Sequence, residues 1–244
     1  MSFVLTFEDA RHESFQQASI YIDACFILAY MNSDDPRGDK VCEMLQKWQG
    51  EGVAKLGISS HVFGEVIHQL FIQEILFPLE IYHNKQLHRK LKSHPDVQLG
   101  PLEESTAFLY DIWKKEIPHF YNNNFVVNVS RLIKSVKNRY PSHRNKLQIF
   151  YNNAIDRYNE FMNALRNDFH VSFLTTNSDI QQLTFAQMKL FQLEVYDALH
   201  YALAMYHGYD YFATLDGDFV HHLYSENSKT KNFKKLPNIL FLPA

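Results

Sequence analysis

The sequence predicts an α/β fold in which helices sandwich a doubly wound, mostly parallel β-sheet, with a helical insertion in the middle of the chain. Two observations carry this prediction. Apolar strand-like runs alternate with helical runs near both ends of the sequence, and such alternation is typical of a parallel sheet with helices on both faces. Between residues 78 and 169 the apolar residues follow a helical period, and no convincing strand interrupts them. We therefore expect a single domain over residues 1–244 that contains a helical insertion at 78–169.

Before Pro78 the alternation contains two strands and three helices. The strands are short and apolar, and serine or proline stands at two of the three expected helix starts, while the third follows Asp23. In chain order we expect a strand at 19–23, a helix directly after Asp23, a helix from Pro36 to about Gly50, a strand at 53–59, and a helix at 61–76 that Ser59 or Ser60 caps and that stops before Pro78. This order of elements is that of a parallel sheet with crossover helices.

After residue 169 the alternation of strand and helix resumes. In chain order we expect a strand at 170–177, a helix at 182–191, a helix that begins close to Asp197, a strand at 209–215 and a strand at 238–242. The sequence thus supplies five candidate strands, three of them after the insertion.

The composition predicts a globular chain, and we expect neither a signal peptide nor a membrane span. The 244 residues are 46% hydrophobic, enough to bury a sizeable core, and the formal charge of -3 neither favours nor excludes a nucleic-acid partner. The longest apolar run, Ala24–Met31, is shorter than the roughly 20 residues that a membrane span needs, and the N-terminus lacks the basic start of a signal peptide. Cys25 and Cys42 have no metal-ligand spacing, so we expect free thiols in a reducing compartment such as the cytoplasm.

Acidic residues occupy the positions where the carboxyl ends of the expected strands would meet. They are Asp23 at the end of the first strand, Asp216 and Asp218 after the fourth, and Glu65 and Asp197 in early turns of helices. In open α/β sheets the ligand site lies outside the carboxyl ends of the strands, near the point where strand order reverses. Carboxylates on one rim repel each other, and a raised pKa or a divalent cation such as Mg²⁺ relieves that repulsion. The acids therefore predict a metal site.

Four motifs resemble those of the PIN-domain nucleases, a family that includes the toxin ribonucleases of bacterial toxin–antitoxin pairs. The motifs are YIDACFILA, ISSHVFGEVIHQL, EVYDALHYALA and ATLDGDF, and they stand in the family's order on the expected elements. The resemblance covers residues 19–73 and 170–242, and because most relatives are shorter it does not extend to the insertion. It implies a PIN-like fold. The catalytic and metal-binding residues that it implies are Asp23, Glu65, Asp197 and Asp216, with Asp218 as a fifth metal ligand.

The resemblance also implies an activity and its partners. The chain would be a Mg²⁺- or Mn²⁺-dependent endoribonuclease that hydrolyses phosphodiester bonds of single-stranded RNA and leaves 5′-phosphate and 3′-hydroxyl ends. A small antitoxin protein and a second copy of the chain, in a homodimer, are the protein partners that it implies. The alternative is a catalytically silent module that binds RNA or a protein on the same fold. The presence of all four acids that the resemblance implies favours the enzyme, because four carboxylates at the centre of a surface that only binds a polyanion would repel it.

Each acid also has an ordinary structural interpretation. Asp23 can cap the helix that follows it, and a turn after a strand can account for Asp216 and Asp218. Glu65 and Asp197 can simply favour the positive end of a helix dipole. The coincidence of four acids on the right elements, in order, favours the metal site over these separate roles.

Other chemistries fit the sequence less well. Two of the acids have a histidine three residues later, His68 and His200, which is the spacing of di-iron carboxylate bundles, but such sites need further helix-borne glutamates. We therefore expect His200 to pack or to form hydrogen bonds beside the site. Cys25 has apolar neighbours that would raise its pKa, which predicts a core thiol rather than a nucleophile. Thr214 can bond a site carboxylate or can serve only as a β-branched strand residue.

The insertion is basic. From Lys85 to Lys146 the sequence has twelve Lys and Arg against five Asp and Glu, an excess of seven positive charges. Three basic residues share one flank of the helix expected at 130–140: Arg131, Lys134 and Lys137. They could hold an RNA backbone, or they could form a solvated face or a docking surface for an acidic antitoxin. Nearby aromatic residues that could stack bases, although burial is their more common role, are Phe120, Tyr121 and Phe125.

Overall fold

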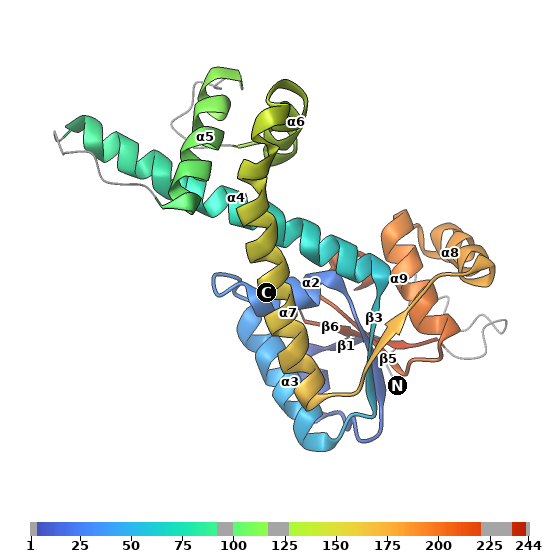
Figure 1. Ribbon diagram of the computed structural model, residues 1–244. Helices are drawn as coiled ribbons and strands as arrows, with labels where there is room; N and C mark the ends of the chain where they lie inside the picture. The colour runs from blue at the N-terminus through green and yellow to red at the C-terminus, as the bar shows by residue number, and fades with distance from the viewer. Residues whose placement is uncertain (1–3, 92–99, 117–126, 221–235, 243–244) are drawn as a thin grey trace. The chain divides into compact units, whose positions relative to one another are not determined.

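The computed structural model describes residues 4–91, 100–116, 127–220 and 236–242, and Figure 1 shows its ribbon. The chain divides into two compact units. The sheet unit comprises Met1–Val66 and Glu160–Ala244, and the helical unit comprises Ile67–Asn159. The chain passes between the units within two helices, α4 (Ser60–Leu91) and α7 (Gln148–Asp168). The aromatic residues Phe120, Tyr121 and Phe125 lie outside the described residues.

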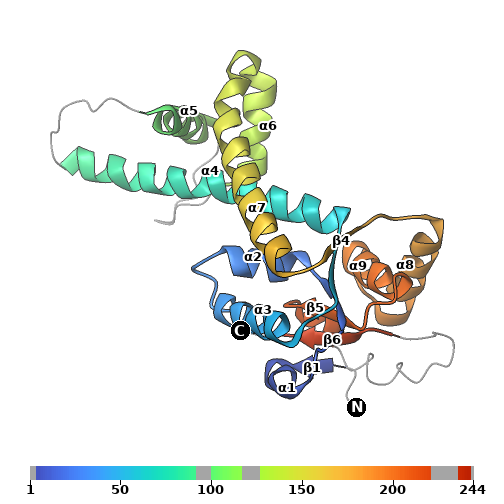
Figure 2. The ribbon, with the colours of Figure 1, turned by 60° about the horizontal axis from the view of Figure 1, so that its bottom comes forward.

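The described residues of the sheet unit form six strands, all parallel, in the order β1-β6-β5-β2-β3-β4. Their bounds are β1 Val4–Thr6, β2 Ser19–Ile22, β3 Lys55–Ser59, β4 Val171–Leu174, β5 Tyr211–Thr214 and β6 Asn238–Phe241. Helices lie on both faces, with α2 (Ala24–Met31) and α3 (Gly38–Glu51) on one side and α8 (Ser178–Phe191) and α9 (Val195–Tyr206) on the other (Figure 1, Figure 2). The predicted α/β fold with a helix-covered parallel sheet is confirmed.

The central strands are apolar because both of their faces are buried. Every residue of β2 and of β5 is buried, and Ile20, Tyr21 and Phe212 have no exposed surface. Strands that helices cover on both sides lose the alternation of polar and apolar residues and become short apolar runs. This is the pattern by which the sequence revealed them.

One strand, β1, does not follow from the sequence pattern. It has three residues, which are half-buried or exposed, and it pairs with β6 at the edge of the sheet, with Val4 opposite Ile239. Thr6 ends this strand and also caps α1 (Phe7–His12), because its hydroxyl accepts a hydrogen bond from the Asp9 N–H at 3.3 Å. Pairing with β6, rather than a strong local preference, makes this segment a strand.

The strand order reverses between β2 and β5. From β2 the chain adds β3 and β4 on one side, and it later returns to add β5 and β6 on the other. The N–H of Asp23, just after β2, donates a hydrogen bond to the carbonyl of Ala213 in β5 at 3.1 Å. The carboxyl ends of β2 and β5 therefore lie side by side at the reversal, which is where open α/β sheets usually bind ligands.

The helical unit contains helices and no strand among its described residues, as the sequence predicts for most of it. Besides parts of α4 and α7 it includes α5 (Pro101–Glu116), α6 (Val129–Arg139) and the 3-10 helix η1 (Pro141–Leu147). Phe71 of α4 stacks on Tyr151 of α7 with ring centroids 3.8 Å apart. The expected insertion at 78–169 overlaps this unit without sharing its ends. The unit begins at Ile67, within α4, and ends at Asn159, within α7.

The prediction that a helix stops before Pro78 is wrong. Helix α4 continues through this proline, although proline removes a backbone hydrogen bond inside a helix at a cost of about 3 kcal/mol. Ile75 and Leu79, on either side of it, are fully buried, and Glu74 forms an ion pair with Arg157 of α7 at 2.8 Å. Packing on both sides of the proline therefore outweighs its local effect.

One helical segment, Ser60–Gln86, is long and apolar enough to cross a membrane by length and composition. The core helix of a soluble protein meets the same two criteria. Two acids of this segment have partners in the folded chain, since Glu65 contacts His200 and Glu74 contacts Arg157. Length and composition alone are weak evidence for a membrane span. The contacts of Glu65 and Glu74 show that both acids face other parts of the described chain.

Candidate metal centre

The five predicted acids lie on five separate segments of the sheet unit. Asp23 directly follows β2, and Asp216 lies two residues after β5. Asp197 is in the first turn of α9, Glu65 is in an early turn of α4, and Asp218 lies in the short 3-10 helix η2 (Gly217–Val220). The structure gathers them into two groups whose possible ligand atoms lie within 4.8 Å of one another: Asp23 with Glu65 and His200, and Asp197 with Asp216 and Asp218.

Asp23 is held in place by three hydrogen bonds, and its side chain is only 9% exposed. Its Oδ1 accepts from the N–H of Ala24 at 2.6 Å. Its Oδ2 accepts from the Thr214 hydroxyl at 3.0 Å and from the Cys25 thiol at 3.1 Å. Asp23 is also the N-cap of α2, so its capping role coexists with its place in the cluster. Thr214 likewise combines both of its expected roles, as a strand residue and as a partner of a site carboxylate.

His200 connects Glu65 to a buried polar chain. Its Nε2 lies 3.1 Å from Glu65 Oε1 and 4.0 Å from Asp23 Oδ1. Its Nδ1 lies 2.9 Å from the Tyr21 hydroxyl, which donates a hydrogen bond to the Ser59 hydroxyl at 3.0 Å. His200 is 1% exposed, which confirms the expectation that it packs and forms hydrogen bonds beside the acids. These contacts hold the Glu65 carboxylate toward Asp23.

The charge of His200 follows from its two neighbours. Burial alone lowers the pKa of His200, but the hydrogen bond to Glu65 and the negative charge of Asp23 outweigh burial and raise the pKa above its ordinary value. The imidazole therefore favours its protonated form more than a free histidine does, and it offsets part of the negative charge around it.

Asp197 experiences the negative charge of both groups of acids. Burial raises the pKa of Asp197, the charges of Asp216 and Asp23 raise it further, and the pKa reaches about 7 although His200 lowers it. The two groups adjoin through Thr214, whose hydroxyl donates to Asp23 Oδ2 at 3.0 Å and accepts from the N–H of Asp216 at 3.0 Å. A carboxyl group with a pKa of about 7 is only half ionised near neutral pH. The positive charge of His200 therefore does not fully offset the burial and the neighbouring acids that disfavour an ionised Asp197.

Asp216 and Asp218 also form a turn. The N–H of Asp218 donates to Asp216 Oδ1 at 2.9 Å, and the N–H of Asp216 donates to the Thr214 hydroxyl at 3.0 Å. These bonds agree with the ordinary turn interpretation of the two acids. The same turn brings both carboxylates close to Asp197, so the turn and the cluster occur together.

The donor atoms of the site could hold a divalent cation. Five of the six residues in the two groups are carboxylates, and the sixth, His200, directs its Nε2 at Glu65. Carboxylate oxygens suit hard cations, whereas thiolates and several imidazoles favour softer metals. A cation would also relieve the repulsion that raises the pKa of Asp197. The chemistry of the residues present thus fits a metal ion with oxygen ligands.

The competing chemistries find less support in the geometry. Burial and the charge of Asp23 raise the pKa of Cys25 well above its ordinary value, so this thiol is not a thiolate nucleophile at neutral pH, in line with the prediction. A di-iron bundle needs glutamates on further helices, whereas the acids that accompany Glu65 and Asp197 follow strands β2 and β5. The arrangement resembles the ligand site of an open sheet instead.

Sequence reasoning missed part of this site, namely the roles of Tyr21 and Ser59. Tyr21 lies two residues before Asp23 on β2, and side chains at that spacing point to the same face of a strand. The spacing could therefore have placed Tyr21 on the same side of the sheet as Asp23. Ser59 was expected only as a helix cap, and it does accept a hydrogen bond from the N–H of Val62 at 3.2 Å, but it also accepts one from Tyr21.

Comparisons of this chain with protein-family models, with curated proteins and with solved structures found no match. The PIN-like fold and the nuclease activity therefore stay predictions.

Proposed function

We propose that this chain is a metal-dependent endoribonuclease of the PIN-domain type that hydrolyses phosphodiester bonds of single-stranded RNA. The observation that carries the proposal is the crowding of five carboxylates at the carboxyl ends of β2 and β5 and on the helices beside them. Burial and the charges of Asp216 and Asp23 raise the pKa of Asp197 to about 7, so burial and crowding together disfavour the ionised form. A bound cation would offset that effect and would serve phosphate chemistry.

In this proposal Asp23, Asp197 and Asp216 hold one or two Mg²⁺ or Mn²⁺ ions, and Glu65 and Asp218 act through bound water. When bound, the cation lowers the pKa of a water molecule and neutralises charge on the phosphate, so that water can attack without a covalent enzyme intermediate. Products with 5′-phosphate and 3′-hydroxyl ends are part of the same proposal.

Residues around the acids keep these oxygens in place. The Thr214 hydroxyl and the Ala24 N–H each fix one oxygen of Asp23. His200 orients the Glu65 carboxylate through its Nε2, and Tyr21 orients His200 in turn. Partners of this kind matter, because removing the groups that orient metal ligands typically lowers metal affinity or activity by about 10- to 100-fold.

Exposed aromatic side chains that are close to the acids in sequence support a single-stranded substrate. Tyr196 directly precedes Asp197 and is 58% exposed, and its ring centroid lies 6.4 Å from that of His61. Phe63, two residues before Glu65, is 44% exposed. Unpaired bases stack on exposed rings, whereas the bases of a duplex are already stacked on each other.

The biological setting of the proposal rests on the resemblance in the sequence. In this setting the chain is a toxin that a small antitoxin protein holds inactive, it forms a homodimer, and it acts in the cytoplasm. Cys25 and Cys42 are free thiols, which agrees with a reducing compartment.

Incubation of the purified protein with a mixed RNA pool, with and without Mn²⁺, tests the proposal. We expect cleavage only with the metal, 5′-phosphate ends on the products, and no cleavage by Asp23→Asn, a variant that should keep the circular dichroism spectrum of the wild type. Cleavage in EDTA at the rate seen with Mn²⁺ would contradict a metal mechanism. Binding of RNA without cleavage in Mn²⁺ would instead favour the catalytically silent module.

A further inference from the structure

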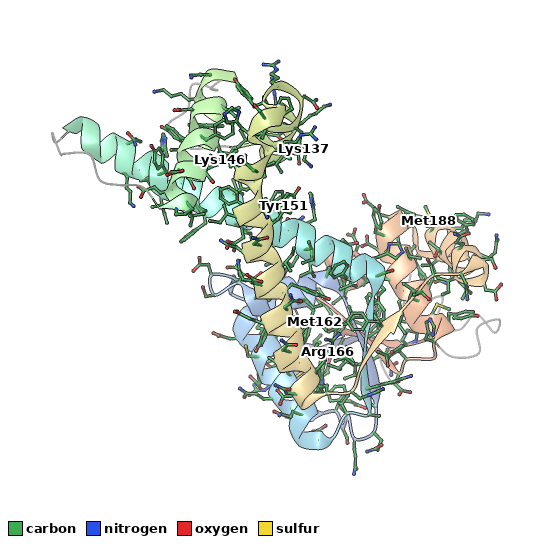
Figure 3. The ribbon with its side chains drawn as sticks, in the orientation of Figure 1. Lys137, Lys146, Tyr151, Met162, Arg166 and Met188 are labelled. Atoms are coloured by element: carbon green, nitrogen blue, oxygen red, sulfur yellow. The ribbon has the colours of Figure 1, made fainter. Side chains whose placement is uncertain are left out.

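Residues 127–147, which comprise α6, η1 and the two residues before α6, form a segment with six Lys and Arg and no Asp or Glu. We call it the basic segment. Its cations are Arg131, Lys134, Lys137, Arg139, Arg144 and Lys146, of which Figure 3 labels Lys137 and Lys146. The first five of these side chains are exposed, and Lys146 forms an ion pair with Glu104 of α5 at 3.1 Å. One continuous stretch of the helical unit therefore presents positive charge to solvent.

The fold of α6 does not explain its row of cations. The helix is anchored by an apolar stripe on its other flank: Val129, Leu132 and Val136. Arg131, Lys134 and Lys137 follow each other at intervals of three, so neighbours repel by about 0.2 to 0.5 kcal/mol per pair. Arg131 is also in the first turn, where the helix dipole disfavours a positive charge, and that turn contains no acid. Among the described residues, none forms an ion pair with these three side chains. Helix stability therefore does not account for these three cations, whereas a role outside the fold does.

The end of α6 extends the row with an ordered cation and an exposed ring. The Arg144 guanidinium donates two hydrogen bonds to the carbonyl of Lys137, at 2.7 and 3.2 Å, and this contact fixes Arg144 beside the last turn of the helix. His143 is exposed, and its ring stacks on Phe108 of α5 with centroids 5.2 Å apart and planes 21° apart. A flat ring that is already supported from behind is suited to stacking with a base.

The composition of the basic segment favours a nucleic acid over a protein as its partner. Protein interfaces are anchored by buried apolar and aromatic side chains and are depleted in lysine. Among residues 127–147, no large apolar side chain is exposed. Cations along a helix, without an apolar anchor, instead match the evenly charged backbone of a nucleic acid.

We propose that the basic segment binds the phosphate backbone of single-stranded RNA, with Arg131, Lys134 and Lys137 as the phosphate contacts and His143 as a stacking platform. The choice of RNA rests on the proposed function, but the binding itself does not require cleavage. The surface would hold the strand independently of sequence, because contacts to phosphates carry no base information.

The test measures binding in EDTA, so that no metal ion held by the acids of the sheet unit contributes to binding and no metal-dependent cleavage occurs. The probe is a labelled polyuridylate of about 20 nucleotides, longer than the site size of a typical single-strand binding fold. Arg131→Glu/Lys134→Glu/Lys137→Glu should weaken binding at least tenfold and should flatten the dependence of log K on log salt by about 2, since each contact to a single strand contributes about 0.7. The milder Arg131→Ala/Lys134→Ala/Lys137→Ala should flatten the slope equally, and it guards against misfolding of the first variant.

A matched control separates this surface from net charge. Lys115→Glu/Arg166→Glu/Lys189→Glu makes the same change of charge at three exposed residues of α5, α7 and α8, and it should leave the salt slope near that of the wild type. Equal losses of RNA affinity in the control and test variants would overturn the proposal. Wild-type affinity and salt slope in both test variants would overturn it too, and would mean that the basic segment serves a protein partner or the fold. Tighter binding of a duplex than of the single strand would overturn it as well. Because no cleavage is measured, failure of the proposed nuclease activity would be seen separately, in the incubation with Mn²⁺.

Discussion

The sheet unit and the helical unit each gather charges of one sign, but they hold those charges differently. In the sheet unit Asp23 is buried with both oxygens bonded, and Asp197 is crowded enough that burial and neighbouring acids raise its pKa to about 7. In the helical unit Arg131, Lys134 and Lys137 are exposed on one helix. Fixed, partly desolvated acids suit a small cation that must be held at one point. Exposed cations on long side chains suit an extended polyanion that can bind in many registers.

This difference predicts that variants in the two units affect different steps. The largest effect should come from Asp197→Asn, which we expect to reduce RNA cleavage by more than about a hundredfold, because even groups that only orient metal ligands change activity by about 10- to 100-fold. RNA binding should stay the same or become tighter, since a negative charge near phosphate is removed. Single-turnover cleavage and filter binding measure the two quantities on the same protein.

Asp179→Asn is the matched control for this variant. Asp179 is an exposed acid in the first turn of α8, as Asp197 is an acid in the first turn of α9. If both acids served only the helix dipole, both substitutions would leave cleavage unchanged. Equal cleavage by Asp197→Asn and by the wild type would remove Asp197 from the site.

The second prediction concerns metal binding without RNA. Millimolar Mg²⁺ or Mn²⁺ should raise the melting temperature, because a ligand that binds only the folded state stabilises it by about 2.7 kcal/mol at a hundred times its Kd. Asp23→Asn and Asp216→Asn should abolish the rise. Arg131→Glu/Lys134→Glu/Lys137→Glu should keep it in full, since those residues lie in the other unit. A melting curve of the wild type that ignores both metals would contradict the cation site.

The third prediction is a pH dependence of the metal-free protein. The Asp197 carboxyl keeps its proton in the folded chain up to a pH of about 7, whereas its ordinary pKa is 3.8. Between these values the folded state binds more protons than the unfolded state, so the free energy of unfolding falls as pH rises from about 4 to about 7. His200, whose pKa the Glu65 and Asp23 contacts raise against burial, acts in the same direction, because its stabilising charge is lost as pH rises through its folded pKa.

Thermal melting across this pH range measures the effect. Asp197→Asn should make the curve flatter, and Mg²⁺ should flatten it in the wild type, because the cation replaces the proton as the partner of the carboxylate. Stability that rises with pH over the same range would contradict the crowding of acids.

Much of the sheet and its acids could be predicted from the sequence because their signals are local. Strands β2 and β5 are short apolar runs; Asp23 directly follows β2, and Asp216 lies two residues after β5. Strand β1 and the passage of α4 through Pro78 could not be predicted, since pairing with β6 and burial of Ile75 and Leu79 decide them. Such contacts depend on residues far away in the chain.

The polar chain beside the site shows the same limit. Tyr21 and His200 are 179 positions apart, and Glu65 and His200 are 135 apart, so no window of sequence contains both partners of either hydrogen bond. The spacing of Asp197 and His200 matched that of di-iron bundles, an interpretation set aside from the sequence alone, and in the structure His200 bonds to Glu65 on another helix. The sequence predicted that Glu65 and His200 lie at or beside the site, but it did not predict a role for Tyr21. The fold alone decides which of these side chains meet.

The smallest predicted effect on chemistry, and the sharpest test of how the acids are held, is His200→Ala. Loss of the imidazole leaves the Tyr21 hydroxyl and the Glu65 carboxylate without their shared partner, which should lower the free energy of unfolding by about 1 to 3 kcal/mol. Cleavage should fall by about tenfold, the lower end for a group that orients a metal ligand, and the rise in melting temperature with Mn²⁺ should persist. His143→Ala, at an exposed histidine of the helical unit, should change stability by less than about 0.5 kcal/mol. A loss of cleavage as large as that of Asp197→Asn, together with loss of the Mn²⁺ effect, would mean that His200 binds the metal itself. The sheet unit would then hold its cation with a nitrogen ligand as well as carboxylate oxygens, and the site would no longer be an all-oxygen one.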